Sequence, residues 1–490
     1  MNWESRTLQG LLPGLQNASL ATLEIHGVAQ DSREVAPGDL FLARSGLQHK
    51  GADFIAAAAQ CGAVAALLDA GEFDEAQQWP IPVLPVTDLN GQLGPIAARF
   101  FGCPSHEMRV VGITGTNGKT SCSHFVAQAL QHAGHRSAVV GTVGNGFIGR
   151  LHESSHTTPD AVGLQRLLAE LRAEDAEVVV MEVSSHALEQ RRVAGVEFDV
   201  VLFTNLSRDH LDYHGSLDAY GAAKSLLFTD YQAPAGAIWC DDAFGQKLHN
   251  QLAGGEMRLI SAGETRADIR AEQVLLNEQG ISGLLKTPWG AVNLHSPLVG
   301  GFNLTNLMLS AGALGLLELN TSEIERGLNA VKPVAGRMQR LGGGQQPMVV
   351  IDYAHTPDAL QQALSALRSH CQGQLICVFG CGGDRDHGKR AQMGTVAASW
   401  ADLLVVTSDN PRSETPDSII EMVLEGIPAD QPRLVEADRR SAIAQAVAQA
   451  RAGDIVLIAG KGHETYQEIH GERFAFSDLS EAQQALEAGV

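Results

Sequence analysis

A glycine-rich segment, RVVGITGTNGKTSCSHFVAQAL at residues 109–130, carries the strongest chemical signal in the sequence. Its glycines would let backbone N–H groups approach a polyphosphate, and the following helix would point its N-terminus at the anion. Lys119 would reach the β- and γ-phosphates, and the Thr120 hydroxyl would be a ligand of Mg²⁺. The strict pattern G-x-x-x-x-G-K-[ST] fails by one position, because Ile113 stands where the first glycine is required. A glycine turn with a chance Gly-Lys-Thr is the alternative, but the strand–loop–helix context favours phosphate binding.

Polar side chains follow two later candidate strands. Glu182 stands at the carboxyl end of the strand at 177–183, on the same side as the phosphate loop, where a carboxylate suits a second Mg²⁺ contact. A solvated or helix-capping glutamate is the alternative, and the polar neighbours at 184–186 favour a site. His210 and His214 are four residues apart, as in a helical zinc pair, but no glutamate follows His210. A zinc-hydrolase site is therefore not expected.

Lys224 lies on a mostly apolar predicted helix at 220–228. Desolvation would favour its neutral amine, which can take up CO₂ to give a carbamate. A carbamate is a hard oxygen ligand suited to Mg²⁺. From the residues alone, the alternative is an ordinary lysine whose stem covers apolar surface while its head reaches water.

Eight candidate strands must position these groups, and several are continuous apolar runs, as expected when helices cover both faces of a parallel sheet. Polar clusters follow many of them, at the edge where open α/β sheets hold ligands. The sequence therefore predicts an α/β fold with parallel sheets. The segment at 54–70 is alanine-rich and predicts a buried helix. The candidate strands lie at 109–114, 137–141, 177–183, 200–205, 348–352, 374–379, 402–407 and 454–459.

The length of 490 residues exceeds one ordinary core and predicts three domains. Prolines between 80 and 95 mark a first break, and Pro333 with the glycines at 336–344 marks a second. The expected parts are an N-terminal domain at 1–88, a linker at 89–107, a central P-loop ATPase domain with a parallel sheet at 108–335, and a C-terminal Rossmann-like α/β domain at 336–490.

The formal charge is −21, from 56 acidic and 35 basic residues, and such a surface repels nucleic acid. Apolar runs are too short to span a membrane, and residues 1–14 lack the pattern of a secretory signal. We expect a cytoplasmic, monomeric protein with neither a membrane nor a nucleic-acid partner. Its seven cysteines show no zinc-type pairing and are expected to be reduced.

The segment GITGTNGKTS closely resembles the ATP loop of the Mur ligases and their folate-polyglutamating relatives. These enzymes activate a carboxylate as an acyl phosphate, which an amine then attacks. Further segments resemble the family in the same order along the chain, and this joint order strengthens each match. They are DHLDYHGSLDAYGAAK, GFNLTNLMLSAGA, GRMQRL and VVIDYAHTPDAL.

The resemblance implies ATP as co-substrate and Mg²⁺ as cofactor, and it assigns residues to both. Asn306 would contact the base, and Arg337, Asp352 and His355 would lie around the nucleotide. Catalytic roles fall to Lys119, His210 and Lys224, with Lys224 as N6-carboxylysine. The implied metal ligands are Thr120, Glu182, His210 and Lys224. The implied ATP loop residues are Gly115, Thr116, Asn117, Gly118, Lys119, Thr120 and Ser121.

The N-terminal segment QDSREVAPGDLFLARSG, residues 30–46, resembles the uridine-binding segment of the third and fourth Mur ligases, with Ser32 as a contact. A turn with Asp/Ser caps before a strand is the alternative. Lys50 stands where an aspartate is common, so uracil contacts from residues 47–49 (Leu47, Gln48 and His49) are left open. Arg192 would suit a substrate carboxylate or phosphate. The positions that match the muramoyl-dipeptide site are Thr157, Thr158, Ser184, Gln190 and Arg192.

The segment TSDNPRSETP begins at the end of the strand at 402–407, and its DNPR matches the signature of the Mur ligases that add meso-diaminopimelate. This amino acid resembles lysine with a second amino-acid head, whose carboxylate Arg412 could grip bidentately. Asp409 and Asn410 could receive the accompanying ammonium. A type I turn is the alternative for DNPR alone. The residues implied for this site are Arg385, Asp409, Asn410, Pro411, Arg412, Gly460 and Glu464.

The resemblance thus implies an ATP-dependent ligase that adds meso-diaminopimelate to UDP-N-acetylmuramoyl-L-alanyl-D-glutamate in peptidoglycan synthesis. A lysine-adding Mur ligase would differ only in the amino-acid pocket, where Arg412 is the discriminator. A folate-polyglutamate ligase would share the phosphate loop but lack the uridine-like segment and DNPR. A nucleotide-driven switch protein would hydrolyse ATP without regard to precursor or amino acid.

Overall fold

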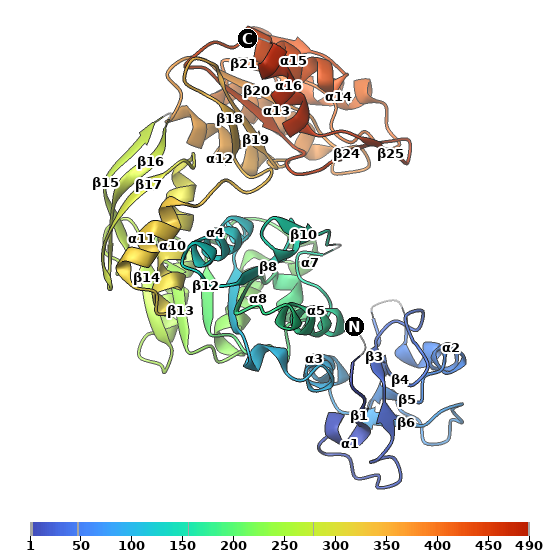
Figure 1. Ribbon diagram of the computed structural model, residues 1–490. Helices are drawn as coiled ribbons and strands as arrows, with labels where there is room; N and C mark the ends of the chain where they lie inside the picture. The colour runs from blue at the N-terminus through green and yellow to red at the C-terminus, as the bar shows by residue number, and fades with distance from the viewer. Residues whose placement is uncertain (1–2, 47–48, 155, 278, 489–490) are drawn as a thin grey trace. The chain divides into compact units, whose positions relative to one another are not determined.

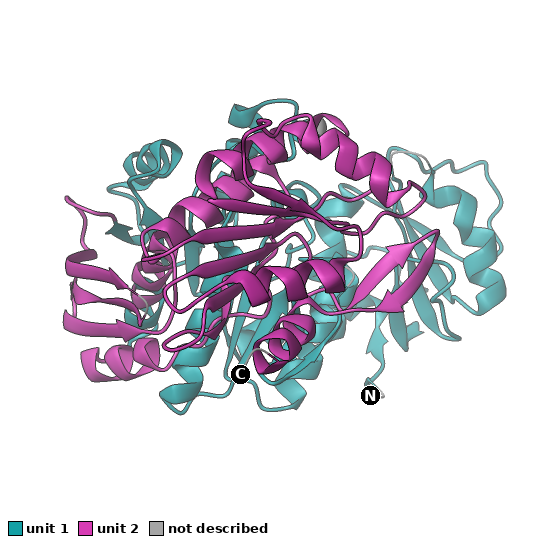
Figure 2. Ribbon diagram, turned by 90° about the horizontal axis from the view of Figure 1, so that it is seen from above, with its two compact units in different colours: residues 1–262, 312–319 teal, residues 263–311, 320–490 magenta. Residues whose placement is uncertain are grey.

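Parallel strands alternate with helices through most of the chain in the computed structural model, which describes residues 3–46, 49–154, 156–277 and 279–488 (Figure 1). The contacts divide the chain into two units (Figure 2). Unit 1 contains residues 1–262 and 312–319, and unit 2 contains residues 263–311 and 320–490. The predicted α/β class with parallel sheets is confirmed.

The first part of unit 1 is a four-stranded parallel sheet whose strands lie in chain order. Its strands are β3 (Gly27–Ala29), β4 (Asp39–Ala43), β5 (Ala65–Asp69) and β6 (Val83–Val86). The turn η1 (Gly51–Phe54) and helix α2 (Ile55–Cys61) lead from β4 to β5. The buried helix predicted at 54–70 is present only as α2, and the prediction is wrong for the second half: Gly62 ends α2 with a left-handed φ of 104°, and the next apolar residues are buried in β5.

Helix α3 (Leu89–Phe100) occupies much of the predicted linker. It packs on α5 (Ala161–Ala173), and both helices contribute to one apolar cluster with the N-terminal sheet. The short elements β1 (Arg6–Thr7), α1 (Leu8–Leu11) and β2 (Glu24–Ile25) complete this region. The division at 88, 107 and 335 stays a prediction.

The second part of unit 1 is an eight-stranded sheet. Its strands β8, β11, β7, β12, β13 and β14 are parallel to their neighbours in that order, and β9 and β10 are added to β8 as antiparallel strands. Glu182 pairs with Ile113, and Phe203 pairs with Thr114, so the residues after three neighbouring strands meet at one edge. In sheet order the strands are β10 (Arg150–His152), β9 (Gly144–Phe147), β8 (Ser137–Gly141), β11 (Val178–Glu182), β7 (Arg109–Thr114), β12 (Val200–Phe203), β13 (Ala235–Trp239) and β14 (Arg258–Ala262).

Helices and one 3₁₀ turn connect these strands, and their apolar faces bury the sheet. The helix that the sequence predicts after the glycine-rich loop is present and begins at Lys119. Besides α5, which connects β10 to β11, these elements are η2 (Pro104–His106), α4 (Lys119–His132), α6 (Ser185–Glu189), α7 (Leu211–His214), α8 (Leu217–Thr229) and α9 (Ala243–Leu252).

Unit 2 begins with a three-stranded antiparallel sheet, β15 (Arg270–Asn277), β16 (Gly280–Thr287) and β17 (Gly290–Ser296). Helix α11 (Thr321–Asn329) packs against β17, and a capping box formed by Asn320 and Glu323 fixes its start. Helix α10 (Gly301–Leu316) belongs in part to each unit.

The C-terminal sheet of unit 2 has the order β18-β19-β23-β20-β21-β22, and all its pairs are parallel except β18 with β19. Separate apolar clusters bury its two faces, which is the arrangement that the continuous apolar strands predict. The strands are β18 (Gln339–Gly342), β19 (Met348–Asp352), β20 (Leu375–Phe379), β21 (Leu403–Val406), β22 (Arg433–Val435) and β23 (Ile455–Ala459).

Helices α12, α13 and α14 contribute to one of these clusters, and α15 and α16 contribute to the other. Their bounds are α12 (Pro357–Arg368), α13 (Gly388–Trp400), α14 (Pro416–Leu424), α15 (Arg439–Gln449) and α16 (Asp478–Ala488). A hairpin of β24 (Tyr466–Ile469) and β25 (Glu472–Ala475) forms a small sheet of its own.

All seven cysteines are free thiols, as predicted. Among the described helices, none combines the length and the apolar character that crossing a membrane requires.

Candidate active site

The phosphate loop runs from the end of β7 to the start of α4 and depends on glycine at two positions. Gly115 and Gly118 have φ values of 145° and 87°, a region that side chains disfavour. A Cβ atom at Gly115 would also collide with the Thr204 hydroxyl. The loop therefore brings its main chain close to β12, and the backbone N–H groups at the start of α4 are suited to bind an anion.

The residues after β12 hold this loop in place. The Thr204 hydroxyl donates to the carbonyl of Asn117 at 2.6 Å, and the Thr116 N–H donates to the carbonyl of Asn205 at 2.8 Å. The Asn117 N–H donates to the side-chain oxygen of Asn205 at 3.0 Å. The sequence reasoning missed Thr204 and Asn205, although their position directly after a buried strand was an available signal.

Two lysines converge on the same loop carbonyl. Nζ of Lys119 donates to the carbonyls of Gly115 and Thr116, each at 2.8 Å, and Nζ of Lys224 donates to Gly115 at 2.7 Å. Lys224 is 1% exposed, and its Nζ lies 4.1 Å from the centroid of the Tyr220 ring. Burial, and then the charge of Lys119, hold the pKa of Lys224 well below its ordinary value. The structure thus favours the neutral amine that carbamate formation requires.

Glu182 lies at the carboxyl end of β11 and is 1% exposed. Its Oε2 accepts from the Thr120 hydroxyl at 2.9 Å, and its Oε1 accepts from the Thr142 N–H at 2.8 Å. Thr142 also donates from its hydroxyl at 3.2 Å. The structure therefore brings Thr120 and Glu182 together, and it adds Thr142, which the sequence reasoning missed. A carboxylate held by such neutral donors is suited to a cation.

The donor set fits Mg²⁺ once Lys224 is a carbamate. Thr120 and Glu182 supply a neutral and an anionic hard oxygen ligand, and the carbamate would add a second anionic group. Within the described ranges, no group of three or more His, Cys, Asp and Glu side chains is arranged to hold a metal ion. The exposed His210 precedes α7, and its ring centroid lies 6.1 Å from that of Tyr220, the residue that also contacts Lys224.

Five of the six residues assigned to the muramoyl dipeptide lie together. The Thr158 hydroxyl donates to the carbonyl of Glu182 at 2.8 Å and accepts from the Ser184 N–H at 3.1 Å. Nη2 and Nη1 of Arg192 donate to the side-chain oxygen of Gln190 at 2.8 Å and to the carbonyl of Thr158 at 3.1 Å. The fifth residue, Thr157, contacts Thr142 through its hydroxyl at 3.1 Å.

Burial, and then the charge of Arg44, lower the pKa of Arg192. A substrate anion would relieve both effects, which supports an anion-binding role for Arg192. The sixth residue, Ser32, follows β3 in the N-terminal sheet, apart from this group in the chain. Leu47 and Gln48, left open as uracil contacts, lie outside the described residues, and His49 stacks edge-on with Phe54 at 6.0 Å between ring centroids.

Of the four nucleotide residues expected in unit 2, three are buried or partly buried and the fourth, His355, is exposed. Asn306 lies within α10, and its amide donates to the side chain of Asn303 at 3.2 Å. Arg337 lies over the Tyr353 ring, with 4.8 Å from Cζ to the centroid, and its Nε forms no hydrogen bond with the described residues. Asp352 accepts from the N–H groups of Met338 and Ala354 at 2.8 and 2.9 Å. Desolvation raises the pKa of Asp352 despite the opposing charge of Arg337.

The DNPR segment, residues 409–412, follows β21 and meets the segment after β23. The side-chain amide of Asn410 donates to Oε2 of Glu464 at 2.8 Å, and its oxygen accepts from Nζ of Lys461 at 2.9 Å. Lys461 also donates to Glu464 at 2.9 Å and is fully buried. The structure therefore brings Asn410 and Glu464 together, and the buried cation between them is a residue that the sequence reasoning missed.

Glycines allow the loops of this site to approach one another. A Cβ atom at Gly460 would collide with Oδ2 of Asp409, and one at Gly382 would lie 2.9 Å from Nη1 of Arg412. A Cβ atom at Gly383 would collide with the carbonyl of Pro411. The Gly-Gly pair after β20 is thus a further requirement of the site, whereas Arg385 of the same loop is exposed.

A buried ion pair lies behind the two loops. Arg439 of α15 and Asp478 of α16 pair at 2.7 Å, and both side chains are fully buried. Nη1 and Nη2 of Arg439 also donate to the carbonyls of Ser408 and Ala459 at 3.1 and 3.0 Å. The pair therefore fixes the spacing of β21 and β23 at the points where the residues of the site begin.

Three family models match the chain in succession. They are the Mur ligase family, catalytic domain, at residues 24–101, the Mur ligase middle domain at 113–314, and the Mur ligase, glutamate ligase domain, at 336–462. A UDP-N-acetylmuramoyl-L-alanyl-D-glutamate–2,6-diaminopimelate ligase from Coxiella burnetii is 47% identical over 487 residues, covering 98% of this chain and 99% of that protein. The chain belongs to the Mur ligase family.

Other relatives agree with this assignment. A protein of the same name from Chromobacterium violaceum is 49% identical and covers 95% of each chain. A solved structure of a ligase of that name has 35% identity and a TM-score of 0.77, covering 99% of both chains. The MurF structure from Acinetobacter baumannii shares the fold, with 19% identity and a TM-score of 0.65. This Mur ligase therefore has the three-domain architecture of the family and is an ATP-dependent ligase.

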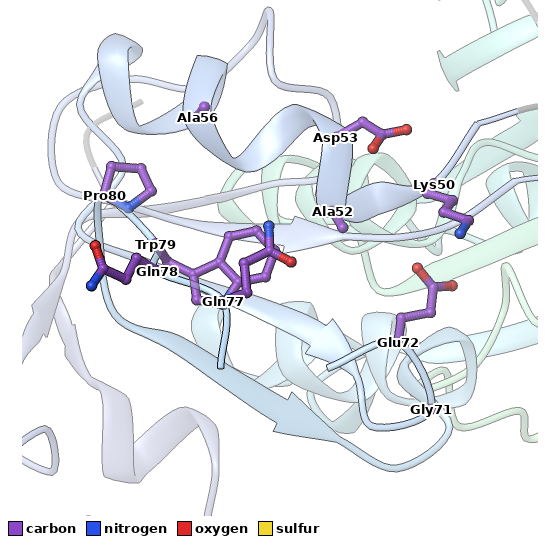
Figure 3. Close-up of a pocket in the computed structure, with 10 residues that line it drawn as sticks. All are labelled: Lys50, Ala52, Asp53, Ala56, Gly71, Glu72, Gln77, Gln78, Trp79 and Pro80. Atoms are coloured by element: carbon purple, nitrogen blue, oxygen red, sulfur yellow. The ribbon is translucent and has the colours of Figure 1, made fainter. Parts of the chain in front are cut away.

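A hollow of about 610 Å³ lies in the N-terminal region of this Mur ligase, between residues 50–56 of η1 and α2 and residues 71–80 that join β5 to β6 (Figure 3). Lys50, Asp53 and Glu72 are among the side chains that line it, and Trp79 lies across its floor. It borders the segment that resembles the uridine-binding residues, but Ser32 does not line it. The position of this hollow therefore does not support the prediction that Ser32 contacts uridine.

Proposed function

We propose that this Mur ligase uses ATP to join meso-diaminopimelate to the D-glutamate of UDP-N-acetylmuramoyl-L-alanyl-D-glutamate in peptidoglycan precursor synthesis. Relatives that carry this name match nearly the whole chain at 47–49% identity. The observation that carries the choice of amino acid is Arg412, whose Nη2 donates to no group within the described part of the chain. A guanidinium with open donors is suited to a carboxylate that lysine does not have.

In the first half-reaction, the γ-carboxylate of the D-glutamate attacks the γ-phosphorus of ATP, the bond to the β-phosphate oxygen breaks, and ADP leaves. Lys119 would exchange its two loop carbonyls for phosphate oxygens, as the charge at the γ-phosphate spreads over those atoms. The backbone N–H groups at the start of α4 would hold the β-phosphate. Arg192 would orient the dipeptide through an anionic group.

Mg²⁺ supplies charge neutralisation to the phosphate oxygens when it is bound, and Thr120, Glu182, His210 and a carbamylated Lys224 would hold it. The buried amine of Lys224 is the group that we propose to be carbamylated, and its lowered pKa supports this. In the second half-reaction, the amine of the amino acid attacks the acyl carbon, and the tetrahedral intermediate expels phosphate. Positioning and electrostatic stabilisation suffice for both steps, and no side-chain nucleophile is required.

The amino-acid site would bind the two charged groups of the distal head of meso-diaminopimelate with side chains of opposite charge. Arg412 and Arg385 would receive its carboxylate, and Asp409 and Glu464 would receive its ammonium group. Asn410, which the sequence suggested for the ammonium, is replaced by Glu464 in this role, because its side-chain oxygen already accepts from Lys461 and from the N–H of Glu468. Lys461 neutralises part of the acidic charge from behind. Asn410 keeps Glu464 in place through its amide. Pro411 and Gly460 shape the loops around the ligand.

We also propose that the protein acts in the cytoplasm as a monomer, on soluble nucleotide and amino-acid substrates. The formal charge of −21 supports the absence of a nucleic-acid partner.

A phosphate-release assay with purified full-length protein tests the proposed function. We expect release to require ATP, Mg²⁺, the uridine-linked dipeptide and an amino acid together, and to be fastest with meso-diaminopimelate. Equal rates with lysine would favour the lysine-adding alternative. Release that ignored both the dipeptide and the amino acid would favour a nucleotide-driven switch and would refute the ligase function.

A further inference from the structure

The hairpin of β24 and β25 follows the loop that carries Glu464 and lies beyond residue 462, where the match to the glutamate ligase domain ends. None of the residues assigned to the amino-acid site belongs to it. Its first strand nevertheless contacts Asp409, Asn410 and Arg412 directly. The hairpin is therefore a candidate for a determinant of specificity rather than of the general reaction.

The main chain of the hairpin holds Arg412 from both sides. The N–H of Arg412 donates to the carbonyl of Glu468 at 3.0 Å, and the carbonyl of Arg412 accepts from the N–H of His470 at 2.6 Å. Arg412 has a φ of 51°, a left-handed conformation that costs free energy in a residue other than glycine. The two hydrogen bonds stabilise this conformation and so fix the direction in which the side chain leaves the backbone.

Two residues of β24, Gln467 and Glu468, form hydrogen bonds with the residues that precede Arg412, at 408–410. Nε2 of Gln467 donates to the Ser408 hydroxyl at 2.9 Å and to the carbonyl of Asp409 at 2.7 Å. The N–H of Glu468 donates to the side-chain oxygen of Asn410 at 2.9 Å. That oxygen also accepts from Lys461, so the amide of Asn410 can only present its nitrogen to Glu464.

The carboxylate of Glu468 lies beside the guanidinium of Arg412, with Oε2 3.6 Å from Nε. On the opposite side, Nη1 of Arg412 donates to the carbonyl of Gly383 at 2.8 Å. Both side chains of the ion pair are about three-quarters buried, with exposed fractions of 26% for Glu468 and 23% for Arg412. The guanidinium is therefore held at two of its nitrogens, and Nη2 is left to receive a ligand.

We propose that Glu468 is a specificity-determining positioning residue, whose carboxylate orients Arg412 to receive the second carboxylate of the incoming amino acid. This inference rests on the proposed function of the site. An amino acid with a distal carboxylate gains from the orientation of Arg412. Lysine has no group for Arg412, so its use does not depend on that orientation.

The test replaces Glu468 by glutamine in the full-length protein. Glu468→Gln keeps the main-chain hydrogen bonds to Arg412 and Asn410 and removes only the charge. We expect KM for meso-diaminopimelate to rise about fivefold, as the loss of one partly screened charge pair predicts. We expect kcat, KM for ATP and the weaker turnover with lysine to stay as in the unchanged protein. An unchanged KM, a lowered KM, or equal shifts for both amino acids would overturn the inference.

Glu472→Gln is the matched control, because Glu472 lies on β25, is exposed, and forms no side-chain hydrogen bond or ion pair with the described residues. It should leave both amino acids unaffected, and a shift equal to that of Glu468→Gln would show a general effect of charge. In an Arg412→Ala background, Glu468→Gln should have no further effect on KM. An additional rise there would mean that Glu468 does not act through Arg412. If the unchanged protein did not use meso-diaminopimelate, the proposed function would fail instead.

Discussion

The phosphate loop of unit 1 and the amino-acid site of unit 2 both lie at the carboxyl edge of a parallel sheet, but they are built in different ways. The phosphate loop presents main-chain groups, and glycines at 115 and 118 with a few hydroxyl and amide side chains keep it in shape. The amino-acid site presents charged side chains, and Lys461, Glu468 and the Arg439–Asp478 pair hold them from behind. Main-chain recognition suits a phosphate that every member of the family must bind, whereas side-chain recognition can select one amino acid.

This contrast predicts that a change in the phosphate loop affects every substrate alike. Lys119→Ala should lower kcat about 10³-fold with either amino acid, because one preorganised charge at the γ-phosphate is lost. Phosphate-release kinetics with meso-diaminopimelate and lysine would measure the ratio of the two losses. A loss of kcat with only one of the two amino acids would contradict this difference between the two sites. Circular dichroism of the variant is the control for folding.

A change at Arg412 should separate the two amino acids. Arg412→Ala should lower kcat/KM for meso-diaminopimelate about 10²-fold, because the distal carboxylate would be desolvated without a partner. Turnover with lysine should change by less than about threefold, since lysine offers no carboxylate to this residue. The same assay with both amino acids measures the ratio. A parallel loss for both would assign Arg412 to folding rather than to selection.

The proposed carbamate should make turnover depend on CO₂. Because the pKa of Lys224 is lowered, its amine is neutral at a pH at which a solvated lysine is protonated. It is protonated, and the carbamate is lost, only as the pH falls through that lowered value. We expect removal of dissolved CO₂ at neutral pH to lower kcat about tenfold, in line with the loss of one metal ligand.

Addition of bicarbonate should restore this activity in the unchanged protein, and Lys224→Met should be inactive under both conditions. If kcat did not depend on CO₂, the proposed carbamate at Lys224 would be wrong. The phosphate loop would then rely on Thr120 and Glu182 for its cation.

Parallel strands such as β5, β6, β13, β14 and β22 were not among the strands predicted from the sequence. The sequence did predict eight strands that are all present in the fold, because several of them are continuous apolar runs bounded by polar residues. It predicted the phosphate loop for a similar reason: glycines and the Gly-Lys-Thr triplet act through local conformation. The error at 54–70 arose because alanine is a strong helix former, whereas after Gly62 burial in the sheet overrides this local preference and places residues 65–69 in β5.

The supporting residues of the two sites could not be predicted from spacing. Thr142 and Asn205 act through strands that are neighbours only in the folded sheet. Lys461 looks like an ordinary charged residue after a strand until its contacts with Asn410 and Glu464 are seen. Glu468 acts through a hairpin whose register sets its place beside Arg412.

The most direct test of the account is a competition between amino acids, with the nucleotide product weighed by mass spectrometry. The full-length protein would receive ATP, Mg²⁺, the uridine-linked dipeptide and equal concentrations of meso-diaminopimelate and lysine. We expect nearly all of the nucleotide product to carry the mass of diaminopimelate. A product that carried lysine in equal or greater amount would contradict the role assigned to Arg412 and the proposed function with it.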